Sequence, residues 1–443
     1  MRIAGLLEHA LRDIDTLEEY YSEQYESTIK YVKKEHDKYK YGLAIYKYLC
    51  GRLHEEEKPH CMNELEEKFI SEEVEIVEDK QDKKNVQYKL RNPEKYVKYE
   101  LDPIIADRKV ISLLEQSEIL NDSVLIMLLI KYENIISEIY GKLLKAFPDA
   151  YLKEKSITYS KLISMNSDID EIMKAFIESE IDEFMRRPLK EWYEVFEHKH
   201  KLHFEFGDEF EDFKEIYYRR NIVVHNKGIA NSSYIEGVSE KYKCGIGTRL
   251  SPNNGYLNNA FDCTRIVLVE TFLGINKLAE DDNKVINELF LIGYDYMQKK
   301  KWMVSKHIFK ELGGLKGQSD ADKWCNTVNF YVSCKNLDGI DSIRKEVENM
   351  DTSLMKPRLA IAKPALLDDN CIVSSILETI IGSDISVNEI KTWPLLLQYR
   401  ESEEYKDFIN KHADLFEIES CSTDDISCLS DNHEDLITMK GSV

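Results

Sequence analysis

The stretch FKEIYYRRNIVVHNKG, residues 213–228, combines regularly spaced apolar side chains with arginines, an asparagine and a histidine. Its apolar side chains recur at helical spacing, which predicts one amphipathic helix. These side chains are Phe213, Ile216, Tyr217, Val223 and Val224. Gly228 suits the left-handed conformation that ends many helices, so we expect the helix to stop there. Asn221 and His225 are four residues apart and therefore share a face of the helix. Arg220 lies about 140° around the helix from His225, and its long side chain can reach the same site.

A histidine and an arginine placed in this way suit the cleavage of a phosphodiester bond in RNA. The imidazole would accept a proton from a ribose 2′-hydroxyl near neutral pH. The guanidinium would grip the phosphate and stabilise the charge that grows on its oxygens. On spacing alone a structural role is more common, because arginine and histidine both interact well with the last carbonyl groups of a helix.

The segment RRNIVVHNKG, residues 219–228, resembles the Arg-x4-His motif of the HEPN superfamily. The resemblance includes the polar residue after the arginine and the Val-His-Asn-x-Gly ending. Many HEPN proteins are metal-independent ribonucleases of toxin and anti-phage defence systems, in which two protomers form one composite site. The resemblance therefore implies that Arg220, Asn221 and His225 are catalytic, that no metal or cofactor is used, and that the chain is a homodimer acting on RNA.

The charge around the motif differs from that of the whole chain. A net charge of −22 argues against general coating of nucleic acid. Between residues 214 and 249, however, seven lysines and arginines stand against three acidic residues. We therefore expect a local phosphate-binding mouth. The residues expected to bind substrate there are Arg219, Asn226 and Lys227.

Glu133 lies in IKYENIISEIY, residues 130–140, within a strongly apolar helical stretch. It resembles the acidic residue that is often found on an earlier HEPN helix beside the motif. In that position it would hydrogen-bond Arg220 or His225 and set the tautomer of the imidazole, so we include it among the catalytic residues. An ordinary exposed glutamate is an equal alternative.

Three histidines, His198, His200 and His203, follow two glutamates closely and suggest a possible metal site. On a helix, however, the first two histidines would point about 200° apart. The neighbouring lysines at 199 and 201 would also repel a cation. We favour a solvated helix end, or basic residues near the path of the RNA.

The segment 1–103 is expected to combine a long helix with a small β element. A helical stripe runs from residue 1 to about residue 56. Residues 72–102 change to alternating apolar and polar positions, which predicts a half-buried hairpin, with a third strand at 96–101. This element would be a structural flap or a partner surface.

The segment 104–282 is expected to be an all-α bundle, which matches the HEPN arrangement. Its candidate helices are 107–119, 122–147, 156–165, 168–186, 189–204, 209–227 and 256–279.

The segment 283–415 is expected to form short paired helices. Gly293, Tyr296, Ser305 and Phe309 have spacings that resemble those of a tetratricopeptide-like helical hairpin. Stacked hairpins make a curved surface, so we expect a protein partner or trigger to bind here and regulate the chain. The alternative is a plain helical domain that braces the dimer. Residues 416–443 are polar and acidic, which predicts a disordered tail.

Composition also predicts the location of the protein. No apolar run approaches the roughly 20 residues that span a bilayer, and acidic residues come too early for a signal peptide. Nine dispersed cysteines are typical of reduced thiols. We expect a cytoplasmic protein without membrane contact.

Together these features predict a mainly α-helical, metal-independent endoribonuclease, a toxin or abortive-infection effector regulated through its C-terminal helices. The alternative is a non-catalytic HEPN-plus-repeat scaffold, or a regulatory protein that binds a nucleotide ligand without cleaving RNA.

Overall fold

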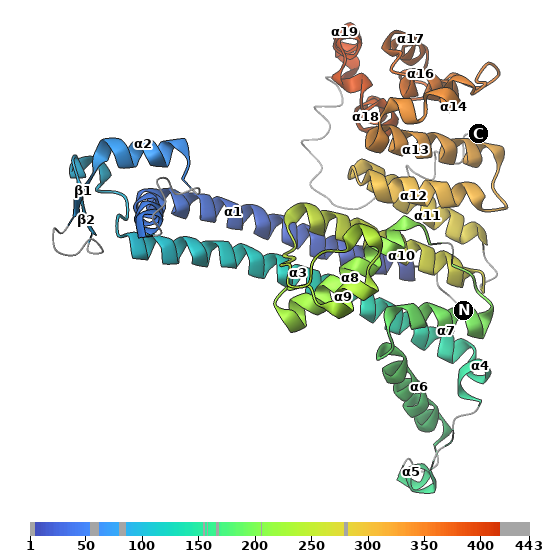
Figure 1. The fold of residues 1–443 in the computed structure, drawn as a ribbon. Helices are drawn as coiled ribbons and strands as arrows, with labels where there is room; N and C mark the ends of the chain where they lie inside the picture. Colours follow the sequence, from blue (N-terminus) through green and yellow to red (C-terminus); the bar gives the residue numbers. More distant parts are fainter. Residues whose placement is uncertain are drawn as a thin grey trace. The chain divides into compact units, whose positions relative to one another are not determined.

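The computed structural model describes residues 5–53, 62–78, 86–153, 156, 158–164, 168–204, 206–278 and 282–416. The described chain is mainly α-helical, and its one sheet has two strands, so the expected fold class is confirmed (Figure 1). No described helix is both long enough and apolar enough to cross a membrane. All but the first residue of the expected acidic tail lies outside the described residues.

The chain packs as two compact units, and each unit is assembled from segments that lie far apart in the sequence. The first unit contains Met1–Leu11, Ile136–Phe210 and Asp262–Val443, and the second contains Arg12–Ile135 and Glu211–Phe261. The motif that begins at Phe213 and the candidate residue Glu133 both belong to the second unit. The continuous domains expected from the sequence remain a prediction, because these units group segments by contact.

Two long helices frame the second unit, namely α1 (Leu6–Leu53) and α3 (Pro103–Ala146). The expected N-terminal helix is thereby confirmed. It runs uninterrupted because it contains no proline and no glycine before Gly42. The two helices approach closely at this glycine, where a Cβ atom would lie 2.8 Å from the Cβ of Ala106. Any larger side chain at position 42 would force the helices apart.

Helix α3 is continuous, whereas the sequence predicted two helices divided near residue 120. That expectation is wrong because the polar side chain at the supposed break has tertiary partners. The Asn121 side chain accepts a hydrogen bond from the Tyr21 hydroxyl at 2.9 Å and donates one to the Pro252 carbonyl at 3.0 Å. A buried amide that is satisfied in this way does not interrupt a helix.

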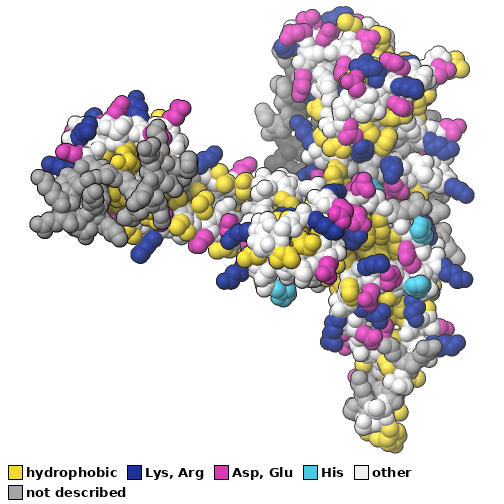
Figure 2. All heavy atoms as spheres, in the orientation of Figure 1, with side chains coloured by type: hydrophobic (Ala, Val, Ile, Leu, Met, Phe, Trp, Pro, Cys, Tyr) yellow, Lys and Arg dark blue, Asp and Glu magenta, His cyan; other side chains and the backbone are white. Residues whose placement is uncertain are grey.

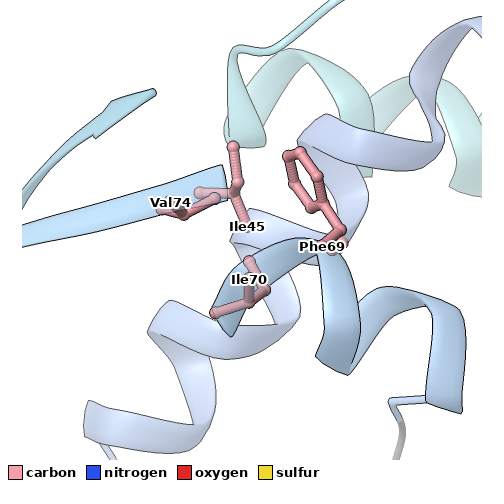
Figure 3. Packing of buried hydrophobic residues seen from close by; sticks show 5 residues of the cluster. Ile45, Phe69, Ile70 and Val74 are labelled. Atoms are coloured by element: carbon pink, nitrogen blue, oxygen red, sulfur yellow. The ribbon is translucent and has the colours of Figure 1, made fainter. Parts of the chain in front are cut away.

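The expected β-hairpin is confirmed. It follows α2 (Glu64–Glu73) and pairs β1 (Val74–Glu78) with the antiparallel β2 (Val86–Leu90). Figure 3 shows Phe69, Ile70 and Val74 gathered against Ile45 of α1. This apolar cluster attaches the hairpin to the long helix.

The third strand expected at residues 96–101 is wrong. Pro93 begins the 3-10 helix η1 (Pro93–Tyr96) instead. The ring of Tyr96 then packs edge-on against that of Tyr41 of α1, with centroids 4.9 Å apart, and Tyr99 makes a similar contact at 4.6 Å. The alternating spacing of these tyrosines resembles that of a strand, but their rings pack against α1.

The motif region contains two longer helices, α8 (Asp208–Asn226) and α10 (Asn254–Asn276). Two short elements lie between them, α9 (Ser232–Gly237) and the 3-10 helix η2 (Glu240–Tyr242). The helices expected at 209–227 and 256–279 correspond to α8 and α10, so both are confirmed.

In the first unit, four helices follow α3: α4 (Pro148–Leu152), α5 (Tyr159–Ser164), α6 (Ile169–Met185) and α7 (Leu189–His200). The last three confirm the helices expected near 156–165, 168–186 and 189–204. Aromatic residues form their core: Tyr140 stacks on Phe184 with ring centroids 3.8 Å apart, and the Trp192 indole donates to the Phe184 carbonyl at 2.9 Å.

The C-terminal part of the first unit begins with consecutive helices that pack side by side, α11 (Asp282–Gln298), α12 (Trp302–Gly314) and α13 (Asp320–Asp338). Gly293 permits this close packing, since a Cβ atom there would lie 2.9 Å from Ile308 and 3.1 Å from the Phe309 ring. Tyr296, Ser305 and Phe309 are buried. The paired helices are therefore present, while their membership of a repeat family remains a prediction.

Beyond α13 the elements become short. They are η3 (Ile340–Ser342), α14 (Arg344–Glu348), α15 (Pro357–Ala360), α16 (Ala362–Leu366), α17 (Asn370–Ile380), α18 (Val387–Thr392), η4 (Pro394–Leu396), η5 (Tyr399–Glu401) and α19 (Glu403–Lys411).

Candidate active site

The motif occupies the second half of α8, and the end of this helix is tightly fixed. Lys227 and Gly228 adopt left-handed φ values of 54° and 73°. The Gly228 amide donates to the Ile222 carbonyl at 2.9 Å, and the Asn226 side chain donates to the Ile229 carbonyl at 2.6 Å. These bonds satisfy carbonyl groups at the helix end, as the glycine predicts. Asn226 thus has a capping role, and its assignment to substrate binding stays a prediction.

A second layer of hydrogen bonds holds the chain just after this helix end. Ile229 forms a β-bridge with Arg249. The Leu250 amide donates to the Gly228 carbonyl at 2.8 Å, and the Ala230 amide donates to the Thr248 carbonyl at 2.9 Å. The last turn of α8 is therefore held in a defined position in the second unit.

Arg219 faces a buried network rather than an open surface. Glu215, which is 1% exposed, accepts hydrogen bonds from Arg219 Nε at 2.7 Å, from the Tyr234 hydroxyl at 2.5 Å and from the Tyr256 hydroxyl at 2.8 Å. The guanidinium also lies 4.1 Å from the centroid of the Tyr256 ring. Burial, together with the charge of Glu215, raises the pKa of Tyr256 well above its ordinary value, so its hydroxyl stays protonated and donates.

The sequence alone does not predict this network. The substrate-binding role expected for Arg219 stays a prediction, and these contacts favour a structural role instead. One signal was present: Glu215 precedes Arg219 by four residues, the spacing at which a carboxylate and a guanidinium pair on a helix. The two tyrosine partners, Tyr234 and Tyr256, lie 19 and 41 residues further along the chain.

Arg220 is paired with Glu133 across two helices. Its guanidinium donates a hydrogen bond to the Glu133 carboxylate, and both side chains are largely buried, with exposed fractions of 18% and 23%. Packing of Tyr132 against Phe213, with ring centroids 4.5 Å apart, brings α3 and α8 together beside this pair. Of the two positions considered for Glu133, the structure places it against the motif arginine.

The Arg220 guanidinium keeps unused hydrogen-bonding capacity. Its Nε is buried, and no described residue accepts a hydrogen bond from it. The guanidinium also lies 5.1 Å from the centroid of the Tyr217 ring. Burial, reinforced by the charge of Glu133, raises the pKa of Tyr217, so this phenol remains neutral beside the arginine.

His225 is exposed in the last turn of α8. Its imidazole makes no hydrogen bond, ion pair or ring contact with any described residue, and both of its nitrogens are available for proton transfer. Asn221, one turn earlier on the same face, is half-buried, and its side chain likewise has no hydrogen bond to the described residues. A helix fixed at its end thus presents an imidazole and an amide together.

The basic mouth expected around the motif is largely neutralised by ion pairs. Six of its seven basic side chains contact a carboxylate: Lys214 pairs with Glu211, Arg219 with Glu215, Arg220 with Glu133, Lys241 with Asp212, Lys243 with Glu240, and Arg249 with Glu118. Lys227 has no ion pair with a described residue. Figure 2 shows the same mixing of acidic and basic side chains over the visible face. Four of the six acids lie outside the 214–249 window, so counting within that window overestimated the positive charge.

The three histidines near the end of α7 do not converge on one point. His198 is exposed, and His203 lies 4.0 Å from Glu197. His200 instead hydrogen-bonds the Tyr151 hydroxyl at 2.6 Å. Burial, together with the charge of Lys199, lowers the pKa of His200. These contacts are consistent with the preference for a helix end over a metal site.

Comparisons with protein-family models, with curated proteins and with solved structures find no match to this chain. The functional argument therefore rests on the residues themselves. They combine a carboxylate-held guanidinium, an amide and an exposed imidazole on one fixed helix end, a set suited to binding a phosphate and moving a proton.

Proposed function

We propose that this protein is a metal-independent endoribonuclease that cleaves RNA by attack of the ribose 2′-hydroxyl. His225 accepts the proton of that hydroxyl, and Arg220 stabilises the charge that develops on the phosphate oxygens. Asn221 positions the phosphate, and Glu133 orients the arginine. The products are a 2′,3′-cyclic phosphate and a 5′-hydroxyl. DNA is not cleaved, because it lacks the attacking hydroxyl.

The observation that carries this proposal is the pairing of Arg220 with Glu133 on the helix whose last turn presents His225, an imidazole that no described residue engages. Glu133 holds the guanidinium through one hydrogen bond, and the buried Nε of the same group has no acceptor among the described residues. An arginine held by a carboxylate is preorganised, so less side-chain freedom is lost when it binds a phosphate. The exposed position of His225 lets an RNA strand approach the base directly.

The chemistry favours a homodimer with a composite site. One imidazole can accept the proton of the 2′-hydroxyl, but the departing 5′-oxygen also needs a proton. The second protomer's own motif histidine supplies that proton in the composite arrangement. Ion pairs neutralise most of the positive charge around a single motif. The motif arginine of the second protomer would add positive charge to the composite site.

In this proposal the protein acts in the cytoplasm as a toxin or an anti-phage effector. Helices α11 to α19 form the regulatory part, on which a protein partner or trigger docks. Side-by-side packing of α11, α12 and α13 supports this role, because stacked helices offer a continuous surface to a protein or peptide.

A non-catalytic scaffold is the rival function, and one observation favours it. The basic side chains around the motif are mostly paired with acids, which weakens the attraction of a single chain for RNA. The two functions differ in what expression of the protein does to a cell. A ribonuclease slows growth and leaves new RNA ends, whereas a scaffold does neither.

The test compares wild type with Arg220→Ala and His225→Ala, both in cells and with purified protein in EDTA. His198→Ala is the matched control, since His198 is also an exposed histidine in the last turn of a helix. We expect wild type and the control to be toxic and to leave cyclic-phosphate ends. The two motif variants should lose at least about 10²-fold in cleavage rate.

Two results would reject the mechanism. Cleavage by His225→Ala at the wild-type rate would remove the histidine from the reaction. A requirement for Mg²⁺ would replace the proposed proton transfer with metal-assisted chemistry. If wild-type protein bound RNA without any cleavage, the scaffold would be the better description.

A further inference from the structure

A cluster of potential metal ligands lies in the first unit, on helices that the proposed ribonuclease chemistry does not use. Glu270 comes from α10, while His307 and Glu311 are four residues apart on α12 and therefore share a face. The His307 Nε2 atom lies 2.5 Å from a Glu270 carboxylate oxygen. One ligand atom from each of the three residues falls within 4.8 Å of the others.

Burial makes this cluster unusual. Glu270 is 5% exposed and His307 is 8% exposed, and Glu311 is partly buried beside them. Two carboxylates brought this close in a poorly solvated place repel each other unless a positive charge lies between them. Lys310 approaches Glu311 at 3.7 Å, and the lysine side chain is 66% exposed.

We propose that Glu270, His307 and Glu311 bind one divalent transition-metal ion, with Zn²⁺ as the best match. One imidazole nitrogen and two carboxylate oxygens form a ligand set that zinc accepts, and water completes a tetrahedral shell. Ligand atoms around such an ion lie about 3.4 Å apart, as bond lengths of about 2.0–2.1 Å require. The His307–Glu270 separation of 2.5 Å is shorter than this value, and the glutamate side chains can adjust to it by rotating.

The ion would have a structural role. It would tie α10 to α12, the second of the three side-by-side C-terminal helices. This inference is independent of the proposed ribonuclease reaction, which uses no metal. It also differs from the histidine group at the end of α7, whose members do not converge.

The competing explanation is a proton in place of the metal. A protonated imidazole hydrogen-bonded to Glu270 would account for the 2.5 Å contact without any ion. That explanation gives Glu311 no necessary part, whereas a metal ion needs its carboxylate as the third ligand. The Glu311→Gln variant therefore separates the two explanations, and its partly exposed position makes it the substitution least disruptive to folding.

The experiment uses the full-length chain, treated with EDTA and then dialysed against ZnCl2 or, separately, MgCl2. Bound metal is measured by mass spectrometry of the element, and the melting temperature is followed in parallel. We expect one equivalent of zinc per chain, no magnesium, and a higher melting temperature with zinc. His307→Gln and Glu270→Gln should lose this equivalent, and Glu311→Gln should bind zinc at least about tenfold more weakly.

The matched control is the double substitution His198→Gln with His203→Gln, which removes exposed histidines that bind zinc weakly. It should keep the equivalent and the thermal shift. The proposal is overturned if wild type binds no zinc, or if Glu311→Gln binds it as tightly as wild type. It is also overturned if the equivalent is lost in the control instead. Melting curves in EDTA show which variants remain folded, so loss of zinc is scored only for those.

Discussion

Replacement of Glu215 by alanine should release the helix that carries the motif. The carboxylate is 1% exposed and accepts three hydrogen bonds, from Arg219, Tyr234 and Tyr256. Two of these donors, Tyr234 and Tyr256, lie beyond the end of α8. Their hydrogen bonds to the carboxylate therefore connect the helix to the segments that follow it.

The expected loss follows from these three bonds. Each buried hydroxyl left without an acceptor costs about 1–3 kcal/mol. Removal of one partner from a fully buried ion pair costs about 3–5 kcal/mol. The Arg219 side chain is 12% exposed and keeps its contact with the Tyr256 ring, so its share lies below that range. With relaxation of the tyrosines, we expect Glu215→Ala to lose about 3–5 kcal/mol locally, and Glu215→Gln about 1–3 kcal/mol.

Hydrogen exchange measured on peptides from residues 211–261 is the suitable assay, because it reports local opening in a protein with two units. A loss of about 3–5 kcal/mol lowers amide protection by about two to three and a half orders of magnitude in that region. Glu211→Ala is the control, since that glutamate is on the same helix, is 41% exposed and pairs only at the surface with Lys214. It should change protection by less than about 0.5 kcal/mol. Equal protection in the Glu215→Ala and Glu211→Ala proteins would refute the role of the network.

Three further predictions concern packing, pairing and pH. Gly293→Ala should destabilise the first unit by about 1–3 kcal/mol because its Cβ would meet Ile308 and Phe309, whereas Gly313→Ala, with open space around it, should be neutral or stabilising in thermal melts. In a double-mutant cycle, Glu133→Ala and Arg220→Ala should show a coupling of about 1–2 kcal/mol, between the values for exposed and buried pairs, and a coupling near zero would contradict the pairing. Because burial lowers the pKa of His200, protonation favours the unfolded chain. The contribution of neutral His200 to folding stability is therefore complete above about pH 6.5 and decreases as pH falls below that value. His200→Gln should show a weaker loss of melting temperature in acid, and an identical pH dependence would count against this assignment.

Much of the fold could be predicted because it depends on local pattern. Apolar spacing located α1, α6, α7, α8 and α10, and period-two alternation located the hairpin. The errors arose where a distant partner changes the meaning of a residue. Asn121 looks like a helix break in sequence, but Tyr21 and Pro252 satisfy its amide. Tyr96 and Tyr99 have strand-like spacing, but their rings pack on a helix.

The candidate site divides in the same way. Spacing placed Asn221 and His225 on one face, and the resemblance directed attention to Glu133 as a partner for Arg220. The network around Glu215 could not be predicted, because its tyrosines are brought in by the turns after α8. The charge of the region was also misjudged for a physical reason, since most of the acids that neutralise it come from other segments.

The closed segment between Ile229 and Arg249 has a consequence for protein engineering. Its two ends are bridged to each other, and the Gly247 amide returns to the Ala230 carbonyl at 2.9 Å. A change of conformation within this segment is therefore limited by the bridge between its ends and has little effect on the end of α8. Ile246, which is 74% exposed, marks a turn where a peptide tag or a small reporter domain can be spliced in.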